Sequence, residues 1–354
     1  MLRVAFYSNR VRFDGDFLEK RGLGGSESAL INLTTVWKQT FPEDCIVVYN
    51  SLERETKEFS GVTYKSVLDF KSECKTFDID VFITLRDTEP LFEPFIDTKL
   101  LLFWSQDDSN EAGIKTIATN KYLQERLDTI LVVSNHSYND IKRIIPTTPL
   151  VLLRNGYRED WADDSNMRRD PIAAYNSTPF RGLSILAEVW SEIYWKCMQL
   201  GVNPELRVFT GMSLYQLPDR PQEEQIYNTL KQLPKVTFCG AIPQRNLYEE
   251  LKKVKVLLYP NTFLETSCMA VLEALANGVW VVTSNFGALP EQVVDKRNGF
   301  LISGDPNSSE YKKEFVEKAV YSLVHKLEPD SVGLIFSWQE QVCFLRDYIC
   351  KMLS

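Results

Sequence analysis

The sequence has few histidines, and none of its cysteines lie at the close spacing typical of metal sites. It contains only two histidines, His136 among them, and seven cysteines at positions 45, 74, 197, 239, 268, 343 and 350 without a C-x-x-C pair. This pattern argues against a transition-metal site, which needs clustered histidine and cysteine ligands. The scattered cysteines instead predict reduced, mostly buried thiols in a cytoplasmic protein.

The sequence also has no basic stripe and no long apolar run. Its formal net charge is -8, and nucleic-acid binding depends on clustered Lys and Arg, so nucleic acid is not an expected partner. The short basic cluster LKKVK (251–255) is typical of the solvated face of a helix. The longest apolar runs, such as KLLLFW and VWVV, are too short to cross a bilayer. The N-terminal MLRVAFYSNR predicts a strand rather than a signal sequence. We expect no transmembrane segment, and weak association with a membrane surface stays open.

What is present is an alternation of short apolar runs with helical patterns, in a chain of 354 residues that is long enough for two domains. The first block predicts strands at 3–8, 45–50, 81–84, 99–104, 129–133 and 150–153, and helices at 26–40 and 137–144, the second with Ser137 as its N-cap. The second block predicts helices at 183–200, 223–232, 247–253 and 268–277, and strands at 206–210, 236–239, 256–259 and 279–284.

Between the blocks lies the polar stretch 155–171, which predicts an interdomain linker, and an amphipathic helix ends the chain. Near-continuous apolar strands alternating with helices predict an α/β fold with two Rossmann-like, doubly wound parallel sheets. Because open α/β sheets bind ligands beyond the carboxyl ends of their strands, we expect the site in a cleft between the two domains.

The glycine-rich stretch RGLGGSES (21–28) raises the question of a dinucleotide site. Gly22 and Gly24 fit the first two glycines of G-x-G-x-x-G, but Glu27 occupies the third position, and the preceding strand ends well before Gly22. Both the spacing and the residue type therefore argue against an NAD fingerprint. We expect Gly24 and Gly25 in a mobile loop facing the cleft, with Ser26 capping the next helix. The alternative is an ordinary turn before a helix.

The stretch YPNTFLETSCMAVLEALANGVWVV (259–282) carries the strongest chemical signal. An apolar strand leads into a loop with Glu265, and a helix that Thr266 or Ser267 could cap then carries Glu273. The amides of residues 267–269 would be unpaired at that helix start, which is a favourable place for an anion. Glu265 and Glu273 would be separated by about 12 Å of helical rise and so serve opposite ends of one extended ligand. The alternative is two ordinary helix glutamates, although a buried Glu273 would need a partner.

Taken together, these motifs resemble the retaining GT-B glycosyltransferases of family 4. The likeness includes Glu-x(7)-Glu with EALANG, SNFGALPEQVVDKRNGFLI, GLGGSE, ILVVSNHSYNDI, VLLRNGY, STPFRGL, VTFCG and FSWQEQV, in this family's order. The resemblance implies an N-terminal acceptor-side domain at 1–157 and a C-terminal donor-side domain at 158–336. It also implies that the last helix, about 337–354, packs back on the first domain.

The resemblance implies metal-independent transfer of a sugar, with retention, from a UDP- or GDP-sugar to a glycan or other hydroxyl acceptor. Glu265 matches the residue that holds the donor sugar's hydroxyls, and Glu273 matches the one that binds the nucleotide ribose. Arg181 and the amides of Ser267, Cys268 and Met269 match the clamp on the diphosphate, which gains charge as it leaves. The implied donor contacts of the two glycine motifs are Gly24, Gly25 and Gly240. No cofactor is implied beyond the nucleotide sugar, which is a co-substrate.

Two departures from the family pattern bear on catalysis. The family supplies a second basic side chain shortly before Arg181, where this chain has Tyr175 and Asn176. The loop FWSQDDSN has Gln106 before Asp107 where the family often has His before Asp, and glutamine cannot titrate near neutral pH. We therefore expect Gln106 and Asp107 to touch the reacting sugars without a protein base at residue 106. The leaving phosphate can take the acceptor's proton instead, a route that needs no protein base. Alternatively, Asp107 is part of a polar loop that caps a helix.

Two Asp-x-Asp matches, DGD (14–16) and DID (78–80), lie outside the context in which metal-dependent glycosyltransferases use this motif, and we expect no metal there. Two alternatives to a transferase remain: a GT-B-shaped sugar-nucleotide epimerase, and a scaffold that binds nucleotide sugar without turnover. Acceptor identity cannot be read from the sequence, although loops FDGDFLEKR and DDSNEAGIKT are where we expect acceptor contacts.

Overall fold

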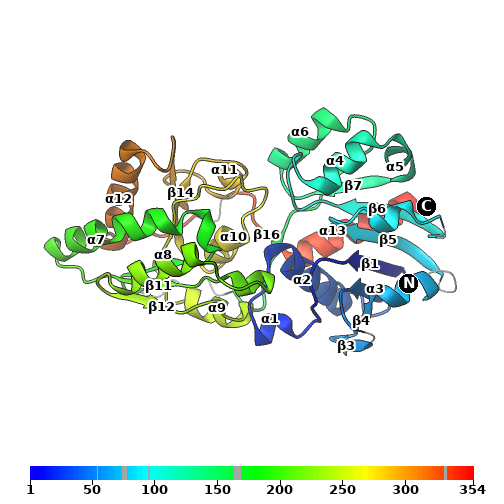
Figure 1. The fold of residues 1–354 in the computed structure, drawn as a ribbon, viewed down its shortest axis with the longest axis horizontal. Coiled ribbons are helices and arrows are strands. Elements are labelled where there is room, and N and C mark those ends of the chain that lie inside the picture. Colours follow the sequence, from blue (N-terminus) through cyan, green and yellow to red (C-terminus); the bar gives the residue numbers. More distant parts are fainter. Residues whose placement is uncertain (54, 74–77, 95, 163–168, 331–332) are drawn as a thin grey trace. The chain divides into compact units, whose positions relative to one another are not determined.

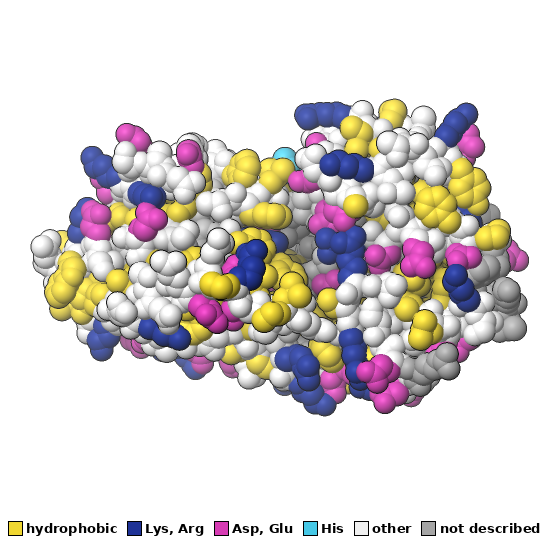
Figure 2. Space-filling model, in the orientation of Figure 1, with side chains coloured by type: hydrophobic (Ala, Val, Ile, Leu, Met, Phe, Trp, Pro, Cys, Tyr) yellow, Lys and Arg dark blue, Asp and Glu magenta, His cyan; other side chains and the backbone are white. Residues whose placement is uncertain are grey.

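The computed structural model describes residues 1–354 except 54, 74–77, 95, 163–168 and 331–332. The chain divides into two compact units. Unit 1 consists of Met1–Leu18, Gly24–Gly156 and Phe336–Ser354, and unit 2 of Glu19–Leu23 and Tyr157–Ile335. On the face drawn in Figure 2, the described acidic and basic side chains are intermingled and form no stripe of one sign.

Unit 1 is built on an eight-stranded sheet with the order β3-β4-β2-β1-β5-β6-β7-β8 (Figure 1). Its strands are β1 Arg3–Ser8, β2 Cys45–Asn50, β3 Lys57–Phe59, β4 Val62–Ser66, β5 Ile79–Leu85, β6 Thr98–Trp104, β7 Thr129–Val132 and β8 Leu150–Leu152. Neighbouring strands are parallel, except that β3 pairs antiparallel with β4. The central strands are apolar throughout because helices cover both of their faces.

The helices of unit 1 are α1 Phe17–Lys20 (shared with unit 2 at its end), α2 Gly25–Thr40, α3 Val67–Glu73, α4 Ala112–Thr119, α5 Lys121–Arg126, α6 Asn135–Ile144 and α13 Trp338–Leu353, with the 3-10 turn η1 Glu89–Phe92. One sheet face, carrying Tyr7 and Phe82, packs on α3 to α6. On the opposite face Phe6 meets Trp37 of α2. The last helix, α13, lies against α2 and β6 (Figure 1), and its Arg346 donates to the buried Asp44 at 2.8 Å.

Unit 2 has a fully parallel six-stranded sheet in the order β12-β11-β10-β13-β14-β15. Its strands are β10 Ile172–Tyr175, β11 Glu205–Val208, β12 Val236–Phe238, β13 Val256–Tyr259, β14 Trp280–Ser284 and β15 Gly299–Ile302. Its helices are α7 Leu183–Gln199, α8 Pro221–Lys231, α9 Gln244–Leu251, α10 Met269–Ala276, α11 Leu289–Gln292 and α12 Ser309–Val324, with 3-10 turns η2 Pro179–Arg181 and η3 Met212–Tyr215. Two further short strands, β9 Gly156–Tyr157 and β16 Phe336–Ser337, pair with each other.

These two sheets confirm the predicted α/β class and its Rossmann-like, doubly wound parallel sheets. The elements that were not predicted are strands β3, β4, β9, β10, β15 and β16, and helices α1, α3, α4, α5, α11 and α12. Strand β10 is short and rich in alanine, so it gives a weak β signal directly after a polar stretch.

One expectation about a helix start was wrong. Helix α6 is capped by Ser134 rather than Ser137, which is the reciprocal partner three residues later. The boundary between the two units falls between Gly156 and Tyr157, at the start of the expected linker. The rest of its described residues pack within unit 2: Trp161 is buried against Tyr248, and Arg169 donates to the carbonyl of Val254 at 2.7 Å. Residues 163–168 of that stretch lie outside the described residues.

The cysteines are less buried than expected. The described ones are free thiols, but only Cys197 and Cys268 are buried, while Cys45 and Cys350 are exposed and Cys239 and Cys343 are intermediate. The expectation for Cys74 lies outside the described residues.

Candidate active site

The loops that follow two adjacent strands of unit 2 bring Arg181 and Glu265 together. Strand β10 pairs with β13; Arg181 ends the turn η2 after β10, and Glu265 lies in the loop after β13. Arg181 Nη1 donates to Glu265 Oε1 at 2.8 Å, and the hydroxyl of Tyr259 donates to the same oxygen at 2.5 Å. The sequence-predicted sugar-binding carboxylate and diphosphate-binding guanidinium are therefore direct partners in this structure.

The pair is largely removed from water. Glu265 is only 2% exposed, and the Arg181 guanidinium lies over the ring of Phe263, 4.3 Å from its centroid. Burial lowers the pKa of Arg181, but the nearby acidic groups, Glu265 first among them, together raise it above its ordinary value. Arg181 thus keeps its positive charge in an apolar setting, where charge–charge interactions are stronger than in water.

The loop between β10 and α7 also holds buried polar atoms without hydrogen-bond partners among the described residues. These are Asn176 Oδ1, Thr178 Oγ1 and Arg181 Nε. The Asn176 amide donates weakly to the carbonyl of Ala270 at 3.4 Å, which puts this loop beside the first turn of α10. Since buried polar groups are normally satisfied, three unsatisfied atoms in one short loop indicate a place where a polar ligand binds.

Two glycines allow these loops to pack closely. Gly182 has φ +111° and its Cβ would collide with the carbonyl of Pro260, while Gly287 has φ +61° and its Cβ would collide with the carbonyl of Glu265. The amide of Ala288 donates to that Glu265 carbonyl at 2.7 Å. The backbone of Glu265 is therefore fixed by a contact that only glycine permits.

Helix α10 begins differently from the sequence expectation. Its N-cap is Cys268, with no side-chain cap, so neither Thr266 nor Ser267 caps the helix. The Cys268 amide, expected to face a diphosphate, donates to Gln292 Oε1 at 3.2 Å instead. Ser267 and Met269 flank this amide at the helix start, where the dipole and the first-turn N–H groups favour an anion.

Glu273 lies within α10, whereas Glu265 precedes the helix, so the two are not separated by helical rise alone. Glu273 is 5% exposed and accepts from Gln244 Nε2 at 2.5 Å. Burial raises its pKa to about 7, although the Gln244 hydrogen bond opposes this shift. The sequence indicated that a buried Glu273 would need a partner but not that Gln244, the first residue of α9, provides it.

Gly240 lies between β12 and α9, with φ +72° and open space where a Cβ would stand. An open cavity of about 490 Å³ runs along the neighbouring sheet face and α9, and Gly240 is not among the residues that line it. The lining residues are Glu205, Arg207, Phe209, Thr237, Cys239, Ile242, Asn246, Glu249 and Glu250.

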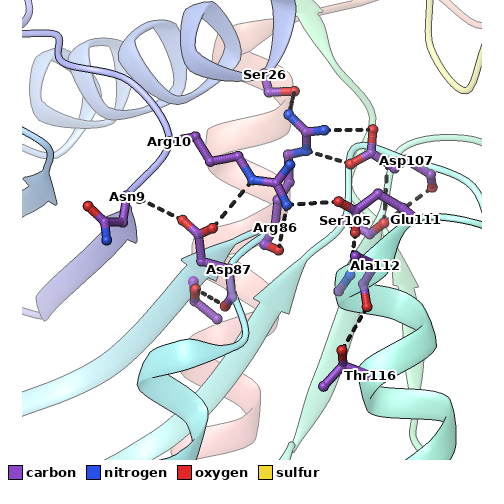
Figure 3. Close-up of polar contacts among 12 residues, drawn as sticks. Asn9, Arg10, Ser26, Arg86, Asp87, Ser105, Asp107, Glu111, Ala112 and Thr116 are labelled. Carbon is purple, nitrogen blue, oxygen red and sulfur yellow. Dashed lines mark hydrogen bonds and ion pairs between the residues drawn. The ribbon is translucent and has the colours of Figure 1, made fainter.

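The remaining predicted site residues belong to unit 1. Gln106 is buried and forms two reciprocal hydrogen bonds with the amide of Asn155, at 3.0 and 2.9 Å. Asp107 forms a bidentate ion pair with Arg86 (Figure 3). Asn155 and Arg86 were missed by sequence reasoning, because no local pattern links residues so far apart in the chain.

Gly24 and Gly25 do not lie in a loop as expected. Gly24 is the N-cap of α2, in an extended conformation, and Gly25 is its first helical residue. Ser26 is not the cap and lies in the first turn, where its hydroxyl accepts from Arg86 Nη1 at 3.4 Å.

The two Asp-x-Asp stretches are engaged in ion pairs. Asp14 pairs with Lys57 at 2.7 Å, Asp78 with Arg3 at 2.5 Å, and Asp80 with Lys99 at 2.7 Å. Within the described residues, no group of three or more His, Cys, Asp or Glu side chains could hold a metal ion. Over the same residues, no helix has the length and apolarity that a membrane crossing requires.

Comparison with known proteins places part of unit 2 in a family. Residues 203–318, from before β11 into α12, match the family described as glycosyl transferases group 1. Alpha-maltose-1-phosphate synthase of Mycolicibacterium smegmatis is 32% identical over 119 residues, which is 32% of this chain and 30% of that protein. The matched stretch thus spans less than a third of this curated relative.

Solved structures extend the likeness in fold to the whole chain. Sucrose-phosphate synthase from Thermosynechococcus elongatus has a TM-score of 0.75 at 14% identity, covering 100% of this chain and 99% of that one. HepE of Anabaena in complex with UDP-glucose has a TM-score of 0.66 at 13% identity, covering 100% and 99%. At this identity the likeness shows the fold, which is the two-sheet GT-B architecture. Residues 203–318 thus match the glycosyl transferases group 1 family, and the whole chain has the GT-B fold.

Proposed function

We propose that the protein transfers a sugar, with retention, from a UDP- or GDP-sugar to a glycan or other hydroxyl acceptor, without a metal ion. The observation that carries the proposal is the ion pair between the partly buried Arg181 and the buried Glu265. It lies beside three unsatisfied buried polar atoms of the loop between β10 and α7, and beside the uncapped start of α10. An apolar setting with one cation, a helix start and a fixed carboxylate suits a ligand with an anionic diphosphate and a sugar.

In this proposal Arg181 stabilises the charge that the diphosphate gains as the glycosidic bond breaks. The diphosphate also accepts hydrogen bonds from the amides of Ser267 and Met269 at the start of α10. The Cys268 amide between them is already bound to Gln292. Donors that are already oriented and largely dry act on developing charge without reorganisation, which is how such groups lower a barrier.

Glu265 accepts hydrogen bonds from the donor sugar's hydroxyls. Tyr259 and Arg181 both donate to its Oε1, and Gly287 holds its backbone, so the second carboxylate oxygen has a fixed direction. A rigid acceptor positions the anomeric carbon, and positioning is a large part of catalysis in a reaction with little covalent chemistry for the protein to perform.

Glu273 binds the ribose hydroxyls, and Gly240 lets the backbone approach the base. Gln244 already donates to Glu273, so a ribose would share or replace this hydrogen bond. UDP is supported as the nucleotide by the UDP-glucose bound to the HepE structure, although that is a property of HepE.

Unit 1 provides the acceptor side, including Gln106 and Asp107, while Gly24 and Gly25 at the start of α2 meet the donor phosphate or sugar. Because Gln106 cannot titrate and is bound to Asn155, the acceptor's proton passes to the leaving phosphate in this scheme. We place the reaction in the cytoplasm, where the free thiols of the described cysteines stay reduced.

The test is to incubate the purified chain with a panel of UDP- and GDP-sugars and follow nucleotide release and the product's anomeric proton by NMR. The proposal expects slow donor hydrolysis, or transfer when a suitable acceptor is present, with the donor's anomeric configuration kept. Tight donor binding without any turnover would favour a non-catalytic scaffold, and an epimerised donor would favour the epimerase.

A further inference from the structure

Two half-exposed phenylalanine rings lie next to the guanidinium group of Arg181 in unit 2. Phe180 belongs to the turn η2 together with Arg181, and Phe263 lies in the loop between β13 and α10. The guanidinium carbon of Arg181 lies over both rings, 4.3 Å from the Phe263 centroid and 5.8 Å from the Phe180 centroid. The two rings pack edge to face, with their centroids 6.4 Å apart. The same cation therefore contacts aromatic side chains from two loops.

Packing in the core does not account for these two rings. Each keeps 41% of its surface exposed, so neither gains the free energy that a phenylalanine gains by leaving water completely. The face of an aromatic ring carries negative charge that attracts a cation, most often an arginine. The two loops are also joined by a hydrogen bond from Thr262 Oγ1 to the carbonyl of Phe180 at 3.4 Å. The guanidinium thus explains the position of the rings better than burial does.

Two contacts together limit how the Arg181 guanidinium can turn. The group is rigid and planar, its Nη1 donates to Glu265 Oε1 at 2.8 Å, and its carbon lies over the Phe263 ring. With both contacts in place, the direction of the Nε–H bond is fixed as well. Arg181 Nε is buried and has no hydrogen-bond partner among the described residues, while 22% of the side chain remains exposed. Nε is therefore an oriented donor that lacks an acceptor, on a side chain that a ligand can reach.

We propose that Phe263 is a positioning residue for the transfer reaction, with Phe180 in a lesser role because its ring lies farther away. Phe263 holds the Arg181 guanidinium so that Nε donates to an oxygen of the donor's diphosphate while Nη1 stays on Glu265. This rests on the proposed function, because the diphosphate belongs to the nucleotide-sugar donor. Since a donor group that is already oriented need not be ordered on binding, the ring acts by fixing Arg181 rather than by touching the diphosphate.

The test replaces the Phe263 ring in two ways. Phe263→Leu keeps an apolar side chain but removes the aromatic face, whereas Phe263→Tyr keeps that face. Phe263→Leu is also combined with Arg181→Ala, to ask whether the ring acts through the arginine. Affinities for UDP and GDP are measured by calorimetry on the full chain, and melting temperatures by fluorescence.

The matched control is Phe41→Leu in unit 1. Phe41 is partly exposed, follows helix α2 directly, and lies under the guanidinium of Arg346, whose carbon is 4.2 Å from the ring centroid. Arg346 is also paired with a carboxylate, Asp44, at 2.8 Å. This variant loses the same kind of contact at residues that are not part of the proposed site.

We expect the wild-type chain to bind UDP or GDP, and Phe263→Leu to bind that nucleotide about three- to thirtyfold more weakly, the range for loss of a cation–π contact. Phe263→Tyr should recover most of the affinity, and Phe41→Leu should bind as the wild type does. Phe263→Leu should melt close to the wild type, because its ring is only partly buried. In Arg181→Ala, the same substitution should cause no further loss, because no guanidinium is left to hold.

Three results would overturn the inference: unchanged nucleotide affinity in Phe263→Leu, a loss that Phe263→Tyr does not recover, or an equal loss in Phe41→Leu. A loss of the same size in the Arg181→Ala background would also overturn it, because Phe263 would then act on the nucleotide without the arginine. If Arg181→Ala does not fold, the comparison of Phe263→Leu with Phe263→Tyr still decides. A wild-type chain that binds neither UDP nor GDP is a different failure, since it removes the proposed function itself.

Discussion

The loops that follow the strands carry different charged side chains in the two sheets of this protein. In unit 2, the strand ends carry one guanidinium paired with one carboxylate, with unsatisfied polar atoms close by. In unit 1, the strand ends carry two guanidinium groups, Arg10 and Arg86, each paired with a carboxylate. One architecture thus carries different side chains at its two sheet edges, and the site residues rather than the fold decide which ligand each edge binds.

Replacing Arg181 tests the anion-binding edge and has the largest expected effect. Arg181→Ala should reduce kcat/KM for the nucleotide sugar by about 10²–10³-fold, as for removal of a preorganised donor to developing charge. It should also destabilise the fold by about 3–5 kcal/mol, since Glu265 would stay buried without its cation. Arg181→Lys keeps the charge and should fold normally while still losing activity.

The matched control is Arg207→Ala. Arg207 is a partly buried arginine of unit 2 with two carboxylate partners, Glu205 and Glu250, outside the proposed site. Equal losses of kcat/KM in Arg181→Ala and Arg207→Ala, at matched folded fraction, would remove Arg181 from the diphosphate site.

Gly287 tests whether unit 2 needs a rigid Glu265. Gly287→Ala places a Cβ against the Glu265 carbonyl at φ +61°, whereas Gly201→Ala has a similar φ of +78° with open space around it. Gly287→Ala should therefore lose about 1–3 kcal/mol more stability than Gly201→Ala, measured by urea unfolding. Equal losses would mean that the close contact with Glu265 is not constraining.

Glu273 tests how unit 2 recognises the nucleoside. Glu273→Gln should raise the donor KM by about tenfold, because a charged acceptor for the ribose hydroxyls is lost, with a small change in kcat. Its stability above pH 7 should not fall: the folded pKa of about 7 lies above the ordinary value of 4.5, so the buried charge costs stability as pH rises between these values. A variant that mainly unfolds would make Glu273 a structural residue.

The pH dependence of donor affinity is the smallest expected effect. Ribose hydroxyls favour the charged form of Glu273, so affinity for UDP-glucose should increase from pH 6 to pH 8, by at most about tenfold for a group with pKa near 7. Calorimetry on wild type and Glu273→Gln measures it, and a slope that persists in the variant would assign the titration to another group.

The sequence predicted the two α/β blocks because buried parallel strands are apolar throughout, as in β6 and β13. It singled out Arg181 and Glu265 through motifs, but their direct pairing depends on strands β10 and β13 being neighbours, and β10 itself was missed. The partners Gln244, Asn155 and Arg86 could not be predicted, because each contacts a residue distant in sequence and no local periodicity encodes such a pair.

The central claim is that unit 2 binds the nucleotide-sugar donor through Arg181, and UDP affinity tests it most directly. Calorimetry on the wild-type chain, Arg181→Ala and Arg207→Ala should give UDP binding to the wild type. Arg181→Ala should bind at least about tenfold more weakly, as for loss of a charge-assisted hydrogen bond, and Arg207→Ala, which loses a paired arginine outside the proposed site, should bind as the wild type does. Unchanged UDP affinity in Arg181→Ala, or an equal loss in both variants, would contradict the account.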